Sequence, residues 1–174
     1  LRFGATLDES LLRRAGDVEW LAETLSAAGN NWVRLVFRPN GADFTYSSLA
    51  SFQEYDAAIE ALGKRGLKVM GCALDTAQWP NALTPEIYAE RVKNLVLHHK
   101  GTVAAWEVGS ELNGDWFGGS TPIGAERVFK IFSAGAAKAK ELDPDAQTVA
   151  TLYWWEQTAP DYEHSLSGWL KTYV

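Results

Sequence analysis

Two glutamates, an asparagine and two tryptophans lie close together in the segment WEVGSELNGDW, from Trp106 to Trp116. If this segment begins as a strand, alternation puts Glu107 and Glu111 on one face and Trp106 on the other. Glu111 then lies where the strand ends and a loop begins. A carboxyl group enclosed by apolar side chains such as Trp106 and Trp116 has a raised pKa and can act as a general acid or base. Glu111 could equally be a structural carboxylate that pairs with an arginine, because the residue types fit both roles.

Strand-like alternation in the run NWVRLVFRPN offers such an arginine, because Val33 and Leu35 alternate with Arg34. A strand covered by helices on both faces is nearly all apolar, whereas a barrel strand can direct a few charged side chains inward. An unpaired buried charge is costly. We therefore predict that Arg34 lies near Glu107 or Glu111 inside the sheet.

The eight tryptophans fall into two groups. An indole offers a flat apolar face and one hydrogen-bond donor, a combination that suits a sugar ring. Four lie near predicted strand ends or in the loops that follow and are candidates for a binding groove: Trp79, Trp116, Trp154 and Trp155. The others follow helical or strand patterns and are predicted to lie in the core: Trp20, Trp32, Trp106 and Trp169.

Other chemistries find little support in the sequence. No Gly-x-Ser-x-Gly turn is present, and neither Ser110 nor Ser120 has a histidine nearby, which argues against a nucleophilic serine. His98 and His99 are adjacent and have no partner four residues away, so we interpret them as surface or core side chains. Cys72 lies in an apolar run and is interpreted as a small buried hydrophobe. The sequence therefore predicts no metal and no organic cofactor.

Five apolar runs are predicted to be strands, and four helical patterns alternate with them. The strands are predicted over Arg2–Leu7 and from near Trp32, Leu67, Val103 and Thr148, the last continuing through Tyr153 to Glu156. The apolar stripes of the helices are Val18, Leu21, Ala22, Leu25 and Ala28; Phe52, Tyr55, Ile59 and Leu62; Tyr88, Val92, Leu95 and Val96; and Val128, Phe129, Phe132, Ala136 and Ala139.

Residues that favour helix ends flank these stripes. Asp17 and Thr84 suit N-caps, and Pro85 suits the first helical position. Gly29 lies where the first helix should end, and Gly63 or Gly66 lies where the second should end. The alternation of strands and helices indicates an α/β fold with a mostly parallel sheet.

Two architectures fit this pattern: the first five βα units of a (β/α)8 TIM barrel, and a five-stranded doubly wound sheet. A closed barrel typically needs about 250 residues, so the 174 residues would form a partial barrel. The charged side chains on inward faces favour the barrel. The turn from Gly4 to Glu9 also lacks the Gly-rich phosphate loop that many doubly wound sheets carry.

Composition limits the class of protein. The chain is 47% hydrophobic and 22% charged, which predicts one globular domain over residues 1–174. A net charge of −6 without a Lys/Arg cluster argues against a nucleic-acid partner. No apolar stretch reaches the roughly 20 residues that span a bilayer. The chain begins at Leu1 without an initiator Met or a signal-peptide pattern, so we expect a processed, trimmed or partly ordered product. A partial barrel is in addition expected to be incomplete at its C-terminus.

The segment WEVGSELNGDW, preceded by GCALDTAQWP and VRLVFRPN, resembles the retaining glycoside hydrolases of the large (β/α)8-barrel clan whose fourth strand ends in Asn-Glu. The resemblance spans five of the eight strands. It implies that Glu111 is the acid/base, that Asp75 and Trp79 form part of the sugar pocket, and that Arg34 is the strand-two arginine. It also implies a secreted or periplasmic protein that acts on a carbohydrate substrate.

The sequence departs from that family in two respects. Ser110 replaces the Asn that holds the sugar 2-hydroxyl, so this hydrogen bond is expected to be lost or provided by Asn113. The family's nucleophilic Glu lies on strand seven, beyond these five strands. Glu156 could form an inverting pair with Glu111, which needs carboxyl groups about 6.5–9.5 Å apart. Nothing in the family supports that role, so Glu156 is assigned to sugar binding or a salt bridge, and Trp116 and Trp154 to sugar binding.

Two hypotheses of function follow. The first is a glycosidase that hydrolyses O-glycosidic bonds of a poly- or oligosaccharide by a retaining two-carboxylate mechanism; these 174 residues alone are then expected to be inactive. The second is a non-catalytic carbohydrate-binding protein, a degenerate partial barrel, which Ser110 favours. If the chain is complete at 174 residues, a homodimer is expected to cover its open sheet edges.

Overall fold

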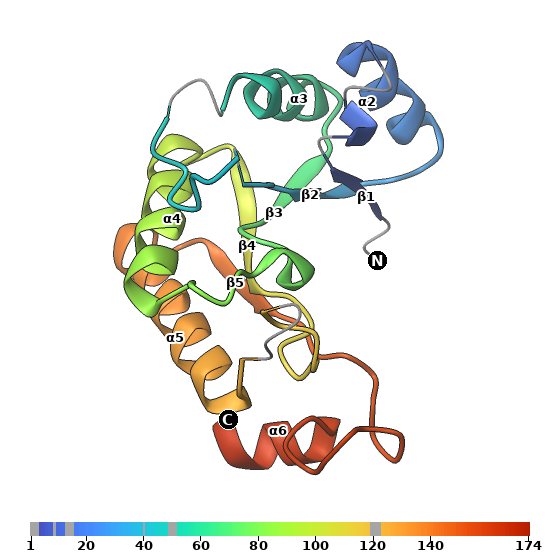
Figure 1. The fold of residues 1–174 in the computed structure, drawn as a ribbon. Coiled ribbons are helices and arrows are strands. Elements are labelled where there is room, and N and C mark those ends of the chain that lie inside the picture. Colours follow the sequence, from blue (N-terminus) through green and yellow to red (C-terminus); the bar gives the residue numbers. More distant parts are fainter. Residues whose placement is uncertain (1–3, 9, 13–15, 40, 49–51, 119–122) are drawn as a thin grey trace.

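The computed structural model describes residues 4–8, 10–12, 16–39, 41–48, 52–118 and 123–174 (Figure 1). Its centre is one parallel sheet in which the five strands follow one another in chain order. The strands are β1 (Gly4–Asp8), β2 (Trp32–Val36), β3 (Lys68–Cys72), β4 (Val103–Gly109) and β5 (Gln147–Ala150). A doubly wound sheet reverses its strand order at a switch point. The sequential order therefore supports the predicted barrel arrangement and contradicts the doubly wound alternative.

In the part of the chain that the structure describes, helices alternate with the strands, and a further helix follows β5. They are α2 (Val18–Ala27), α3 (Gln53–Lys64), α4 (Pro85–His98), α5 (Ala125–Leu142) and α6 (Leu166–Tyr173), with a short 3₁₀ turn η2 (Thr76–Gln78) after β3. Figure 1 shows α2, α3, α4 and α5 in an arc along one face of the sheet. Within the described ranges, no helix has the length and apolar character needed to cross a membrane.

The predicted helix ends are confirmed by hydrogen bonds. Asp17 Oδ1 accepts the backbone N–H groups of Glu19 and Trp20 at 2.9 and 3.1 Å, so it is the N-cap of α2. Thr84 Oγ1 accepts the N–H of Ile87 at 3.2 Å, with Pro85 at the first position of α4. These side chains satisfy N–H groups that have no partner within the helix.

The two faces of the sheet carry different side chains. Val33, Leu35 and Trp106 are fully or almost fully buried and belong to the hydrophobic core. The other face carries Arg34, which is paired in register with Met70, and Glu107, which is paired in register with Cys72. The alternation predicted for β2 and β4 is therefore confirmed, and the charged side chains lie on the face that the helix arc does not cover.

The ends of the first and last strands differ from the prediction. The first strand occupies Gly4–Asp8, and residues 2 and 3 of the predicted span lie outside the described part. β5 ends at Ala150, and the segment from Thr151 to Trp155 is a loop, although its aromatic composition favours a strand. The cause is Asn113, whose side-chain oxygen accepts the N–H of Tyr153 and so takes up a group that would otherwise bond to a strand.

Two tryptophans differ from their predicted core positions. Trp20 is 57% exposed, on the outer face of α2. Trp32 is half-buried, with the Lys68 ammonium 5.9 Å from its ring centroid. Trp106 and Trp169 are buried as predicted. An amphipathic helix pattern does not tell a tryptophan at the margin of the apolar stripe from one at its centre.

Candidate active site

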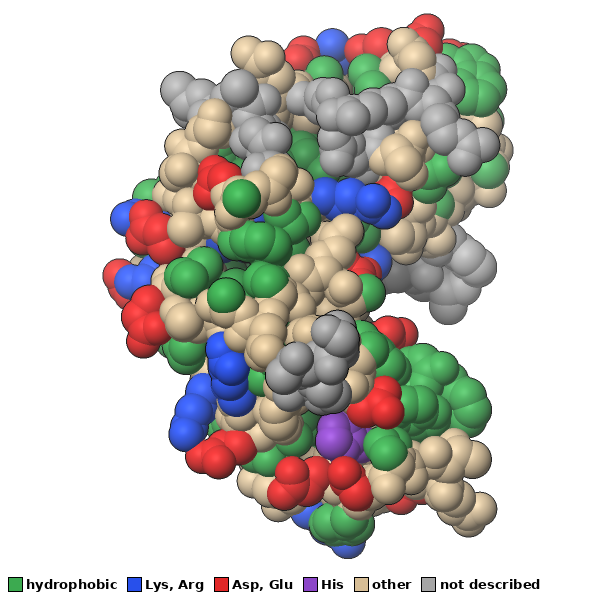
Figure 2. Space-filling model, viewed as in Figure 1, with side chains coloured by type: hydrophobic (Ala, Val, Ile, Leu, Met, Phe, Trp, Pro, Cys, Tyr) green, Lys and Arg blue, Asp and Glu red, His purple; other side chains and the backbone are tan. Residues whose placement is uncertain are grey.

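A cavity of about 420 Å³ lies at the carboxyl ends of the strands, on the face away from the helix arc. Figure 2 shows the surface hollowed on the side between β1 and the segment that precedes α6. Three of the predicted site residues, Arg34, Asp75 and Glu111, line this cavity together. The full lining is Thr6, Arg34, Met70, Asp75, Glu107, Ser110, Glu111, Thr151 and Leu152.

An ion pair crosses the floor of the cavity from β2 to β4. Arg34 Nε donates to Glu107 Oε2 at 2.6 Å, and the Glu107 side chain is only 2% exposed. The same guanidinium donates to Ser110 Oγ and Cys72 Sγ, each at 3.3 Å. The predicted pairing of Arg34 with a strand-four glutamate is thus confirmed. Cys72 is buried, as predicted, and burial raises the pKa of its thiol.

Glu111 lies immediately beyond the end of β4 and is half-buried. Burial raises the pKa of its carboxyl group above the ordinary value, and the negative charges of Asp75 and Glu107 raise it further, against the opposing effect of Arg34. The raised pKa of Glu111 agrees with the prediction, but the cause of the shift differs in part. Trp106 lies on the other face of β4, so it does not enclose this carboxyl group.

Thr151 connects the two strand-four glutamates. Its hydroxyl donates to Glu107 Oε1 at 3.1 Å and accepts the backbone N–H of Glu111 at 3.0 Å. Thr151 is not among the site residues predicted from the sequence. Its position directly after β5 was the available signal, since parallel strands end at the same edge of a sheet and Thr151 therefore lies beside the end of β4.

Asp75 lies at the margin of the cavity. Its Oδ1 accepts the N–H of Ala77 at 3.0 Å and so caps the turn η2. Its Oδ2 lies 3.8 Å from an Arg34 nitrogen. The side chain is about one-third exposed, so this carboxylate remains accessible from the cavity.

Asn113 does not line the cavity and cannot take over the hydrogen bond expected at Ser110. It is completely buried. Its amide donates to the carbonyl oxygens of Tyr153 and His164 at 3.0 and 2.8 Å, and its oxygen accepts the N–H of Tyr153. All the bonds of this side chain hold the loop after β5 in place.

Trp79 also lies outside the predicted groove. It is 2% exposed and packs against Tyr88 and Phe117, with its indole N–H donated to the carbonyl of Leu74 at 3.3 Å. Asp75 and η2 turn the chain back toward the helices at this point. The indole therefore contributes to the core.

The other predicted groove tryptophans form an aromatic cluster beside the cavity. Trp116 and Trp155 are half-buried, with ring centroids 5.6 Å apart, and each packs edge-on against Tyr153. Trp154 is 70% exposed. Figure 2 shows hydrophobic side chains gathered over the segment between β5 and α6. A flat apolar surface is therefore available next to the cavity.

Glu156 lies apart from the cavity lining. Its carboxylate accepts the hydroxyl and the backbone N–H of Ser167, at 2.5 and 3.0 Å, in the first turn of α6. These bonds lower the pKa of Glu156. The carboxylate stabilises the start of a helix, where a negative charge is favourable, and it does not pair with Glu111. Ser120, considered above for nucleophilic chemistry, lies outside the described residues.

No protein-family model and no curated protein matches the sequence. Solved structures with a similar fold include a β-glycosidase, with TM-score 0.68, 14% identity and coverage of 83% of this chain and 46% of the other. A GH5_18 variant from Streptomyces cattleya has TM-score 0.71, 14% identity and coverage of 91% and 47%. A β-glucosidase from Thermotoga maritima has TM-score 0.65, 15% identity and coverage of 81% and 38%.

The chain thus spans less than half of the length of these solved structures. At such low identities the likeness establishes the fold. The five parallel strands and their alternating helices match the first βα units of the TIM barrels in these solved structures.

Proposed function

We propose that this chain carries the acid/base side of the active site of a glycoside hydrolase that cleaves O-glycosidic bonds of a poly- or oligosaccharide. The observation that carries the proposal is the cavity at the strand ends, where Glu111, with its raised pKa, lies among an arginine and two further carboxylates. In barrel enzymes, catalytic groups lie at this end of the strands. The fold shared with solved glycoside hydrolases supports the same class of reaction.

In the proposed mechanism Glu111 is the general acid. Its raised pKa favours the protonated form when the substrate binds. The proton passes from the carboxyl oxygen to the glycosidic oxygen while the bond from that oxygen to the anomeric carbon breaks and the nucleophilic carboxylate bonds to that carbon, which gives a glycosyl-enzyme intermediate. Glu111, now a carboxylate, then removes a proton from the water that hydrolyses the glycosyl-enzyme intermediate.

The nucleophile of a retaining mechanism is a second carboxylate about 5–5.5 Å from the first. Glu107 is a poor candidate, because it is almost completely buried and paired with Arg34 at 2.6 Å. Asp75 also caps η2. We infer that the nucleophile lies on a strand beyond β5, as the resemblance to the Asn-Glu clan implies.

Substrate contacts are proposed for the remaining polar groups of the cavity. Asp75 accepts sugar hydroxyl groups. Ser110 accepts a hydrogen bond from Arg34, and because Asn113 is buried, the Ser110 hydroxyl is proposed as the replacement contact to the 2-hydroxyl. Trp116 and Trp154 provide apolar surface for further rings. One similar structure holds Manβ1-4GlcNAc and another a glucoimidazole. We therefore propose a β-linked oligosaccharide of hexose units as the substrate.

The test uses the longest natural protein that contains residues 1–174. Glu111→Gln is expected to lower kcat about 10²–10⁴-fold on an oligosaccharide, the range typical of a lost general acid. The loss is expected to be much smaller on an aryl glycoside whose leaving group does not need a proton. Glu156→Gln is the matched control and should retain activity, since Glu156 bonds to Ser167 outside the cavity. Equal loss on both substrates would contradict the acid role.

The alternative, a non-catalytic carbohydrate-binding protein, is favoured by one observation. Trp154 is 70% exposed beside the cluster of Trp116 and Trp155, and such a platform binds sugar rings without chemistry. Calorimetric titration with β-linked oligosaccharides separates the two functions. Binding that Trp154→Ala weakens, in a full-length protein that releases no reducing sugar, would support the alternative.

A further inference from the structure

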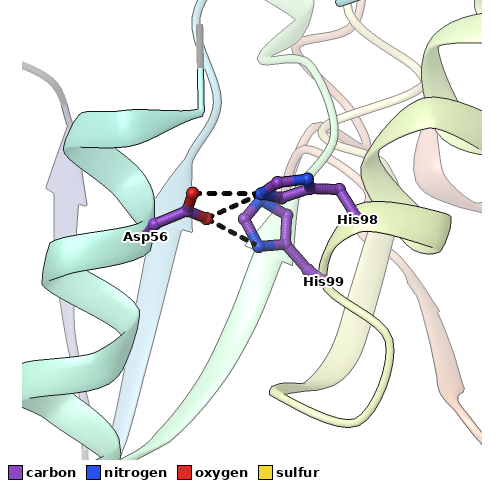
Figure 3. A group of neighbouring side chains, drawn as sticks. All are labelled: Asp56, His98 and His99. Carbon is purple, nitrogen blue, oxygen red and sulfur yellow. Dashed lines mark hydrogen bonds and ion pairs between the residues drawn. The ribbon is translucent and has the colours of Figure 1, made fainter. Parts of the chain in front are cut away.

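A separate group of potential metal ligands lies on the helix-covered side of the sheet, between α3 and α4. Asp56 belongs to α3, His98 is the last residue of α4, and His99 is its C-cap. Figure 3 shows the carboxylate of Asp56 facing both imidazole rings. One ligand atom from each residue lies within 4.8 Å of the other two.

Two of the three ligand-to-ligand distances in this group bracket those of a tetrahedral site, and the third is at most 4.8 Å. His98 Nε2 lies 2.8 and 3.1 Å from the two Asp56 oxygens, and His99 Nδ1 lies 3.7 Å from Asp56 Oδ1. With metal bonds of about 2.0–2.2 Å, neighbouring ligand atoms of a tetrahedron are about 3.3–3.6 Å apart. Small side-chain rotations would therefore bring the three atoms around one ion.

His99 provides an independent indication of a missing partner. Its side chain is 2% exposed, and its Nε2 is a buried atom without a hydrogen-bond partner. Its other ring nitrogen faces Asp56 at a distance too long for a hydrogen bond. Buried polar groups are normally satisfied, so an imidazole left this way calls for an explanation. A cation between His99 and Asp56 would accept the lone pair of Nδ1, the ring atom that faces the carboxylate without a hydrogen bond to it.

The surroundings fix the ligands and leave room for water. The His98 ring stacks on Phe52, with centroids 4.0 Å apart and planes at 12°, which holds its Nε2 toward Asp56. An adjoining cavity of about 450 Å³ is lined by all three ligands and by Glu60. The His98 side chain is 29% exposed, so an ion can enter from solvent.

We propose that Asp56, His98 and His99 bind a Zn²⁺ ion, with water in the fourth position. Two imidazole nitrogens and one carboxylate oxygen form a donor set that Zn²⁺ favours. The ion would link α3 to α4 on the side of the sheet opposite Glu111, so it would serve stability rather than catalysis. The proposal does not depend on the proposed function, and either can fail without the other.

The first test is calorimetric titration of tag-free, chelator-treated protein with ZnCl₂. One equivalent of Zn²⁺ is expected to bind. Asp56→Asn and His98→Gln should each weaken binding by at least about 100-fold, because loss of even an outer-shell partner costs 10–100-fold. His164→Gln is the matched control. His164 Nδ1 also contacts an aspartate, Asp161, at 2.7 Å, but is not part of the three-residue group, so this change should leave affinity unchanged.

A second measurement covers variants that fold poorly. An ion that binds only the folded state raises Tm in proportion to the logarithm of its concentration. ZnCl₂ should raise Tm for the unmodified protein and for His164→Gln, and should leave Tm unchanged for Asp56→Asn and His98→Gln. Absence of stoichiometric binding by the unmodified protein, or equal weakening by His164→Gln and Asp56→Asn, would overturn the proposal.

Discussion

Glu111 has an unusual backbone conformation for its residue type. Its φ of +52° lies in the left-handed region, which costs a residue other than glycine about 1–2 kcal/mol. Two hydrogen bonds hold it there: its N–H donates to Thr151 Oγ1 at 3.0 Å, and its carbonyl accepts the N–H of Gly114 at 2.9 Å. This turn explains why Ser110 and Glu111 both line the cavity, although strand alternation would separate them.

Replacing the Glu111 carboxyl group tests its environment through stability. We expect Glu111→Gln to make the folded protein more stable than the unmodified chain at neutral pH. The pKa of Glu111 is raised above 4.5 by burial, then by Asp75 and Glu107, so the folded state binds this proton more tightly than the unfolded state. The stability that Glu111 contributes is present below pH 4.5 and is lost as pH rises through the folded-state pKa.

Urea unfolding of both proteins across this pH range measures the effect. The advantage of Glu111→Gln should be largest near neutrality and should shrink as the pH falls below 4.5. Glu156→Gln is a control of opposite sign, because bonds from Ser167 lower the pKa of Glu156 and its stabilisation is lost as pH falls. If Glu111→Gln were less stable than the unmodified chain at neutral pH, the raised pKa would be wrong.

Side chains on strands were more predictable than those in loops. The pairing of Arg34 with Glu107 follows from alternation and from the cost of an unpaired buried charge. The positions of Trp79 and Asn113 depend on how the loops after β3 and β4 fold back, and residue types alone do not determine that path. The same limit applies to the contact of Asp56 with His98, because 42 residues separate them.

At the scale of elements, the packing of β3 beside β4 depends on one glycine. Gly71 and Trp106 are paired in register and face the helices. A Cβ atom at Gly71 would lie 2.7 Å from the Trp106 ring and 3.0 Å from Phe37. The indole thus occupies the space that a side chain on β3 would need, which explains how a fully buried tryptophan fits between sheet and helices.

We expect Gly71→Ala to destabilise the fold by about 1–3 kcal/mol, the usual cost of overpacking a core. Gly63→Ala is the matched control. Gly63 lies in α3, where an added Cβ meets nothing within 4 Å, and alanine there should stabilise by about 0.5–1 kcal/mol. Denaturant unfolding of the two variants measures both effects. A Gly71→Ala protein as stable as the Gly63→Ala protein would show that the Trp106 ring moves freely.

The helix boundaries could be predicted because caps act locally. Asp17 and Thr84 bond to backbone groups two or three residues away, so each signal lies within the element that it ends. The end of β5 could not be predicted in this way. It depends on Asn113, a residue 40 positions from Tyr153, which bonds the backbone that would otherwise continue the strand.

At the scale of the whole molecule, the sheet is an arc with two edges. Within the described residues, β1 pairs only with β2, and β5 pairs only with β4. The inner face is correspondingly open: Thr6 is exposed, and Val149 on β5 is only half-buried. In a closed barrel both edges disappear and such side chains are enclosed. The arc therefore presents backbone and apolar surface that another polypeptide segment can cover.

We expect the 174-residue polypeptide, expressed by itself, to self-associate through these edges, because exposed edge strands pair with other chains. Light scattering after size-exclusion chromatography should give masses above 19.2 kDa that rise with concentration. Val149→Lys should shift the distribution toward monomer, since it adds a charge to the inner face of the β5 edge. Glu23→Lys is the control and should leave association unchanged, since Glu23 is exposed on α2 and belongs to neither edge strand. A monodisperse 19.2 kDa monomer at every concentration would mean that the edges are already protected within the chain.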